Sequence, residues 1–118
     1  MASVFDPLGF LAPVELFAKV LLQEIWKSGK DWDEPIDQKL LQHWRRWTQE
    51  LPALTNLTIP RPFTQEKLSS VELHAFADAS EMGFGAVLYL RHVNTDQSVT
   101  VNFISSKTRV ARTYRAHY

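Results

Sequence analysis

One carboxylate lies where a strand is predicted to end, and this residue has the chemistry of a metal ligand. Residues 71–78 alternate apolar side chains with others, which predicts a β-strand, and Asp78 is followed by turn-like residues 79–83. Such a carboxylate can hold Mg²⁺, because this hard cation prefers oxygen ligands. A two-metal phosphodiester hydrolase needs several converging acids. Taken alone, Asp78 fits a local role better, in which it accepts hydrogen bonds from the turn backbone.

A second acidic group precedes the middle of the chain. A calcium loop that starts at Asp31 would need Gly at its sixth position and Glu at its twelfth, where Ile36 and Gln42 stand. We therefore expect these acids to serve a helix, with Asp33 as its N-cap and the others near its positive end. The group consists of Asp31, Asp33, Glu34 and Asp37.

The other polar residues suggest little chemistry. The histidines show no spacing typical of metal ligands, and nothing orients Ser80 and His74 as nucleophile and base. An aspartic protease of the retroviral type needs Asp-Thr/Ser-Gly, whereas this chain has Asp78-Ala79-Ser80. We therefore reject peptidase activity, because the chain lacks the required motif at Asp78. The histidines are His43, His74, His92 and His117.

Basic residues cluster after Asp96, the last acid of the chain. They form a candidate nucleic-acid contact, with a solvated terminus as the alternative. The 13 Lys and Arg residues equal the 13 Asp and Glu residues, and this zero net charge argues against an autonomous nucleic-acid binder. The basic candidates are Lys107, Arg109, Arg112 and Arg115.

Composition sets further bounds. The 118 residues are 45% hydrophobic and 22% charged, as in ordinary globular proteins. The absence of cysteine excludes disulfides, zinc thiolate sites and cysteine nucleophiles. No signal peptide or membrane span is predicted, so we expect an intracellular protein, in the cytoplasm or the nucleus, without a cofactor when alone.

Helices are predicted to come first. From Pro13 to Lys27 the polar positions follow a spacing of four, which predicts a helix with a narrow polar stripe, ended by Gly29. A second helix is predicted from Pro35 to Pro52, because apolar residues recur there at steps of three and four. The two helices should pack together, with the tryptophans as core or semi-buried groups: Trp26, Trp32, Trp44 and Trp47.

Strands are predicted to follow. Residues 71–78, 84–91 and 98–105 read as three strands, and the short connections favour antiparallel pairing. The fold class is therefore α+β, a helical pair joined to an antiparallel three-stranded sheet. The predicted parts are a helical region 1–54, a Pro-containing connector 55–70, a sheet 71–111 and a basic tail 112–118.

Several motifs together resemble one family. The stretch ELHAFADAS at residues 72–80, with GFGAVLY at 83–89, resembles the opening hairpin of a retroelement ribonuclease H domain. SVFDPLGFLAP at residues 3–13, the tryptophan spacing and FISSKTRVA at 103–111 are similar to BEL/Pao-type LTR retrotransposon polyproteins, in the segment also described as the Pao retrotransposon peptidase. The resemblance covers residues 3–111, and as a set its motifs are highly specific.

The resemblance implies more than the residues do alone. By it, residues 1–54 correspond to the thumb or connection region of a reverse transcriptase, and the strands to the first half of a ribonuclease H-like sheet. Asp78 matches the first catalytic carboxylate, which holds Mg²⁺ in the intact parent domain. The parent family combines RNA-directed DNA polymerase with ribonuclease H, and its implied partners are an RNA–DNA hybrid and the rest of the polyprotein.

The chain departs from the family pattern after Ala111. The family continues into a helix with a second catalytic acid, whereas residues 112–118 contain no Asp or Glu. We therefore expect a truncated or frame-shifted copy, or a fragment of a longer product, without catalytic activity by itself. The alternative is a domesticated module that binds nucleic acid or protein through the basic tail and an open sheet edge, which would also permit self-association.

Overall fold

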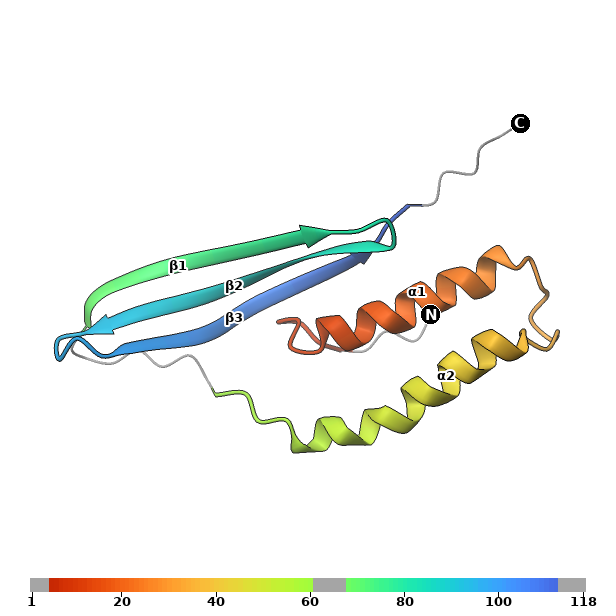
Figure 1. The fold of residues 1–118 in the computed structure, drawn as a ribbon, viewed down its shortest axis with the longest axis horizontal. Coiled ribbons are helices and arrows are strands. Elements are labelled where there is room, and N and C mark those ends of the chain that lie inside the picture. Colours follow the sequence, from red (N-terminus) through yellow and green to blue (C-terminus); the bar gives the residue numbers. More distant parts are fainter. Residues whose placement is uncertain (1–4, 61–67, 113–118) are drawn as a thin grey trace.

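Two helices precede a three-stranded antiparallel sheet in the computed structural model, which describes residues 5–60 and 68–112 (Figure 1). This arrangement confirms the predicted α+β class. None of the described helices combines the length and apolar character that a membrane span requires. The elements are α1 (Ala12–Lys27), α2 (Gln38–Glu50), the 3₁₀ helix η1 (Leu51–Asn56), β1 (Leu68–Ala79), β2 (Gly83–Asn94) and β3 (Val99–Val110).

The start and end of α1 follow from local chemistry. The Asp6 carboxylate accepts the backbone N–H groups of Phe10 at 3.0 Å and Leu11 at 2.7 Å, which fixes the turn that leads into the helix. Pro13 stands in the first turn, where its missing N–H is not needed. Gly29 follows the last turn at φ 68°, a conformation that favours glycine. The predicted helix is therefore confirmed at both ends.

The start of α2 corrects one prediction. Asp37, not Asp33, occupies the N-cap position, and the helix begins at Gln38. The Lys30 ammonium donates to the Pro35 carbonyl and the Asp37 carboxylate, both at 2.8 Å, and these bonds hold the intervening residues as a loop. After Glu50 the chain continues as η1.

The two helices contact each other, as predicted, but they bury few side chains. The Trp47 indole N–H donates to the Val14 carbonyl at 3.2 Å and joins α2 to α1. Trp26 is 58% exposed and Trp32 is 95% exposed, so the prediction that these two are buried or semi-buried is wrong. No residue of α2 is buried. Within the described chain, α2 packs on α1 and on η1, and its outer side faces solvent.

The sheet has the order β1-β2-β3, and its strands are longer than predicted (Figure 1). Pairing extends from the β1–β2 turn to Asn94 of β2, because each residue there has a partner across the ladder. An irregularity opposite Leu88 and Tyr89 inserts one residue into β3 and lets its pairing continue to Val110. Sequence alternation located the strands, whereas cross-strand pairing sets their length.

The helix α1 docks along β3, on the side of the sheet away from β1 (Figure 1). The Ser106 N–H donates to the Leu8 carbonyl at 2.9 Å, and the Thr108 hydroxyl donates to the Ala12 carbonyl at 3.2 Å. Gln23 reaches the Ala111 carbonyl at 3.0 Å. The helix–sheet junction therefore includes hydrogen bonds as well as the apolar contact of Phe10 with Phe103, whose ring centroids are 5.0 Å apart.

Candidate functional site

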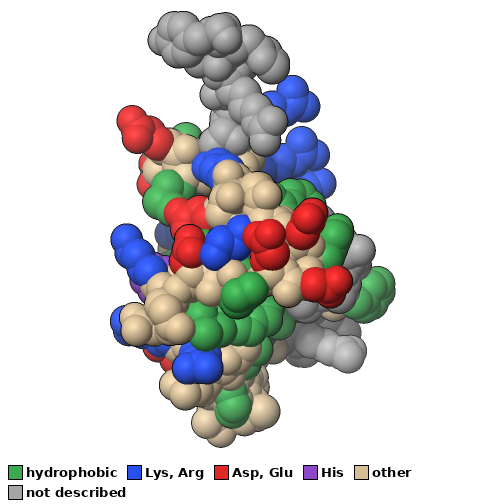
Figure 2. All heavy atoms as spheres, turned by 90° about the vertical axis from the view of Figure 1, so that its right-hand side faces the viewer, with side chains coloured by type: hydrophobic (Ala, Val, Ile, Leu, Met, Phe, Trp, Pro, Cys, Tyr) green, Lys and Arg blue, Asp and Glu red, His purple; other side chains and the backbone are tan. Residues whose placement is uncertain are grey.

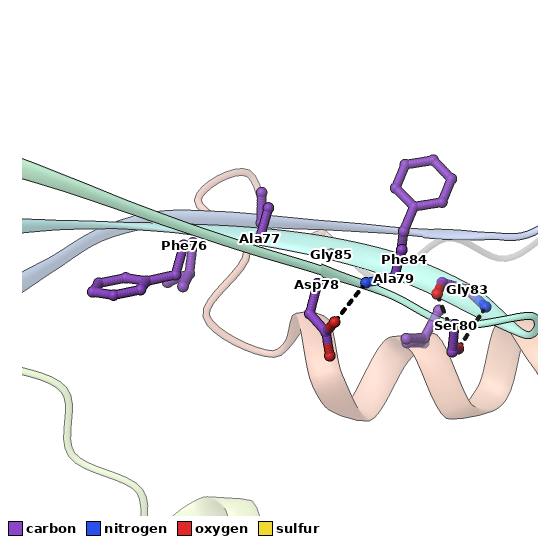
Figure 3. A pocket seen from close by; sticks show the side chains of 11 residues that line it. Phe76, Ala77, Asp78, Ala79, Ser80, Gly83, Phe84 and Gly85 are labelled. Atoms are coloured by element: carbon purple, nitrogen blue, oxygen red, sulfur yellow. Dashed lines mark hydrogen bonds between the residues drawn. The ribbon is translucent and has the colours of Figure 1, made fainter.

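Asp78 is the next-to-last residue of β1, where the sheet meets the β1–β2 turn. It lies opposite Gly85 of β2, which in turn lies opposite Thr108 of β3. The Asp78 carboxylate is exposed and accepts the N–H of Ala79 at 2.9 Å, as Figure 3 shows. The local hydrogen bond expected of a strand-end Asp is therefore present, and it leaves the rest of the carboxylate open to solvent.

The turn beside Asp78 is held by one serine. The Ser80 N–H and hydroxyl both donate to the Gly83 carbonyl, at 2.8 and 3.1 Å, and the same hydroxyl accepts the N–H groups of Met82 and Gly83 at 3.3 Å. Gly83 is needed here, since a Cβ would lie 2.9 Å from the Arg109 carbonyl oxygen. The turn thereby fixes the position of Asp78.

A shallow hollow of about 390 Å³ opens between this end of the sheet and α1. Leu16 of α1 supplies one wall, and the other lining residues belong to β1, β2 and their turn. In Figure 3 the Asp78 side chain points to the side of α1, whereas Phe84 points to the opposite side of the sheet. The carboxylate therefore faces the helix side of the hairpin.

The predicted cations lie on the other face. Arg109 is opposite Phe84 and Lys107 is opposite Ala86, so both share the Phe84 side of the sheet. With Asp78, Gly85 and the alanines of β1 and β2 they border a second hollow of about 680 Å³. Lys107 and Arg109 therefore lie at the same end of the sheet as Asp78, but on the opposite face from its carboxylate. Arg112 is exposed beyond β3, and Arg115 lies outside the described residues.

The donors for a divalent cation are incomplete in the part of the chain that the structure describes. No group of three or more His, Cys, Asp or Glu side chains gathers there at a distance suited to a metal ion. Mg²⁺ is usually bound through one or two carboxylates together with waters and substrate phosphates. Asp78 fits as one ligand of such a site, but the described residues do not complete a two-metal centre.

A network on β1 was not predicted from the sequence. The Glu72 carboxylate is 2.9 Å from the His74 ring and accepts a bond from Arg91 at 3.1 Å. The hydrogen bond from His74, and after it the charge of Arg91, hold the pKa of Glu72 below its ordinary value of 4.5. The spacing of Glu72 and His74 places them on one face of a strand, but Arg91 joins them only through the β1–β2 register.

The surface charge is mixed at the end of the molecule that carries the α1–α2 loop and the β1–β2 turn. Figure 2 shows acidic, basic and hydrophobic side chains side by side on this view. The balance of 13 cations and 13 anions is thus not separated into two large patches on this face. Local pairs such as Lys30 with Asp37 account for part of the mixing.

Comparison with known proteins identifies a family. The model of the family described as Pao retrotransposon-like RNaseH-like domain matches residues 1–117, and so spans both the helices and the sheet. No curated protein matches the chain. No solved structure matches it either.

Proposed function

Because the chain belongs to the family of Pao retrotransposon-like RNaseH-like domains, we propose that it is part of a retrotransposon polyprotein and contributes one carboxylate to a ribonuclease H-type site. The proposal rests on the position of Asp78, the next-to-last residue of β1. Its carboxylate is exposed and accepts the N–H of Ala79 at the start of the turn. In this role Asp78 would hold Mg²⁺, which would orient water and phosphate for hydrolysis.

The chain alone is proposed to be inactive. A two-metal site requires several carboxylates, and Asp78 belongs to no group of three or more potential metal ligands among the described residues. The missing ligands would come from other polypeptide of the parent element, which is the proposed partner. The helical region 1–54 is proposed to be the thumb or connection of the preceding reverse transcriptase, as the resemblance implies.

The test is cleavage of the RNA strand in an RNA–DNA hybrid with Mg²⁺. We expect no product from the purified chain and no difference between the chain and Asp78→Asn. Cleavage that depends on Mg²⁺ and disappears in Asp78→Asn would overturn the proposed inactivity. That result would mean that this chain forms a catalytic site without acids from another polypeptide.

A second candidate function is nucleic-acid binding without catalysis. It is supported by the hollow beside Phe84, where an exposed aromatic ring and small alanines lie next to two cations, because bases stack on aromatic rings and phosphates bind cations. The proposed contacts are Lys107 and Arg109, with Arg112 and Arg115 following them in the chain.

Salt dependence tests this binding role. The double variant Lys107→Gln/Arg109→Gln should lower the slope of log affinity against log salt by roughly two, since each phosphate contact contributes about 0.9. The matched control is Lys39→Gln/Arg45→Gln, which removes two exposed cations from α2. Equal slopes for both double variants would count against the role, as would an affinity that does not respond to salt.

A further inference from the structure

The turn between β1 and β2, residues 80–82, is held from outside the hairpin as well as from within it. The Ala111 N–H donates to the Met82 carbonyl at 3.0 Å, which joins the turn to the residue that follows β3. The Gln23 side chain of α1 donates to the Ala111 carbonyl, also at 3.0 Å. Two hydrogen bonds in series therefore connect α1 to the turn beside Asp78.

A second contact joins α1 to the end of the same turn. A Cβ at Gly83 would lie 3.1 Å from Leu16 Cδ1, so the leucine approaches the backbone of the turn closely. Leu16 and Asp78 line the same hollow. Figure 3 shows α1 on the side of the hairpin toward which the Asp78 side chain points. The helix therefore supports the turn on the face that carries the carboxylate.

The orientation of the Asp78 side chain depends on the start of this turn. Its carboxylate accepts the N–H of Ala79, the last residue of β1, at 2.9 Å. An exposed aspartate has several staggered rotamers available, and this bond selects one of them. Because the turn begins at the next residue, a turn that moves changes the direction of the Ala79 N–H. A fixed turn therefore holds the carboxylate in one orientation.

We propose that Gln23 is a positioning residue for Asp78 and acts through Ala111 and the β1–β2 turn. This inference rests on the proposed function, in which Asp78 is a metal ligand of a ribonuclease H-type site. A ligand already held in one rotamer loses less conformational entropy when it binds a metal ion. The helix α1 then belongs to the nuclease site, although it lies in the region proposed as the end of the reverse transcriptase.

Gln23 differs from the preceding members of the polar stripe on α1. The Lys19 ammonium donates to the Glu15 carboxylate at 2.9 Å, and this pair lies within the helix. Gln23 is half-buried, and its amide reaches a backbone group 88 residues later in the chain. The pair stabilises α1 itself, whereas Gln23 connects the helix to the sheet.

The first test reads the Asp78 rotamer by NMR, from three-bond couplings across χ1, and needs neither metal nor catalysis. The unchanged protein should show one dominant rotamer. Gln23→Met keeps a similar length without a donor, and it should lower the ratio of this rotamer to the others by roughly fivefold at most, as the net contribution of one hydrogen bond allows. Gln23→Lys restores an N–H donor and should restore the ratio. The matched control Gln42→Met changes an exposed glutamine of α2 and should leave the ratio unchanged.

A second variant separates reach from loss of the amide. Gln23→Asn keeps the amide group but is one methylene shorter, so it should lose the bond to Ala111 and behave as Gln23→Met does. An Asp78 rotamer that is unchanged in both variants would overturn the inference. So would an equal loss in Gln42→Met, or a loss that Gln23→Lys does not restore.

Asp96 provides an internal control for the fold of each variant. It lies in the turn between β2 and β3, at the other end of the sheet, and accepts bonds from the Ser98 N–H at 2.9 Å and hydroxyl at 2.6 Å. Its couplings should stay the same in every variant, because no step of the path from α1 passes through it. Circular dichroism checks the helix content of the same samples.

A Mn²⁺ titration tests the ligand role on which the inference rests. Mn²⁺ added to the unchanged protein should broaden the Ala79 amide signal, and Asp78→Asn should abolish this broadening. Gln23→Met should require a Mn²⁺ concentration higher by up to roughly fivefold. A signal that does not broaden in the unchanged protein would contradict the ligand role, whereas the couplings would still report whether α1 positions the side chain. The two failures are therefore distinguishable.

Discussion

Asp78 and Glu72 lie on the same face of β1, yet their surroundings differ. Asp78 accepts one backbone bond and lies opposite a glycine, so no cation neutralises it across the ladder. Glu72 lies between His74 and Arg91, and both stabilise its charge. An acid free of cationic neighbours keeps its charge available for a metal ion, whereas a paired acid serves the sheet. This contrast is consistent with the proposed role of Asp78, and not of Glu72, as a metal ligand.

The pKa of Glu72 gives the prediction at the scale of the residue. His74→Ala should raise this pKa toward 4.5 by more than Arg91→Gln does, because the hydrogen bond from His74 is the larger cause of its lowering. A lowered folded pKa means that the ion pair stabilises the fold above about pH 4.5, and that this contribution is lost as the pH falls through the folded pKa. NMR titration of the side-chain carboxyl carbon measures it.

Asp96 provides the internal control for that titration. Its pKa is also held below the ordinary value, but by hydrogen bonds from the Ser98 side chain and backbone. It should therefore titrate unchanged in both variants. A Glu72 pKa that stays the same in His74→Ala would show that the His74 contact does not persist in solution.

At the scale of the element, the docking of α1 on β3 depends on one glycine before the helix. Gly9 has φ 75°, and a Cβ there would fall on the Ser106 carbonyl oxygen. Glycine is therefore favoured at position 9 for two reasons: the backbone is left-handed, and it approaches the sheet closely.

Two glycine variants separate the cost of the left-handed backbone from the cost of the close approach to the sheet. Gly29→Ala should lower the free energy of unfolding by about 1–2 kcal/mol, which is the cost of a left-handed backbone alone, since nothing lies within 4 Å of a Cβ there. Gly9→Ala should cost more, because β3 must also move away. Urea denaturation of both variants measures the difference. Equal losses would mean that the Leu8–Ser106 contact adds nothing to stability.

The elements also show what the sequence predicts and where it stops. Alternation and helical spacing located α1, α2 and the three strands, but not η1, because these patterns depend on residues close in the chain. Asp33 was predicted as the N-cap because it precedes Pro35, yet Asp37 occupies this position and is bonded to Lys30. The face on which Lys107 and Arg109 lie, opposite the Asp78 side chain, follows from a three-strand register that no local pattern specifies.

At the scale of the whole molecule, the chain is extended and buries little. Its radius of gyration is 19.2 Å, whereas a compact domain of this length would have about 13–14 Å. Ala12 and Leu21 are the buried hydrophobic residues among those described, and both belong to α1. Burial of apolar surface is the main driving force of folding. The sheet must therefore be stabilised largely by its own two ladders.

The uneven distribution of contacts predicts that α2 and the sheet unfold separately. The helix α2 buries no residue and contacts α1 and η1, whereas β2 is hydrogen-bonded on both sides by β1 and β3. Local opening costs least where few contacts are lost. Amide hydrogen exchange should therefore be fast throughout α2 and slowest in the centre of β2. Exchange within β1 should alternate, with outward amides such as that of Ala75 faster than inward ones. Equal protection of α2 and β2 would mean that the helices and the sheet open as one cooperative unit, against the sparse contacts between them.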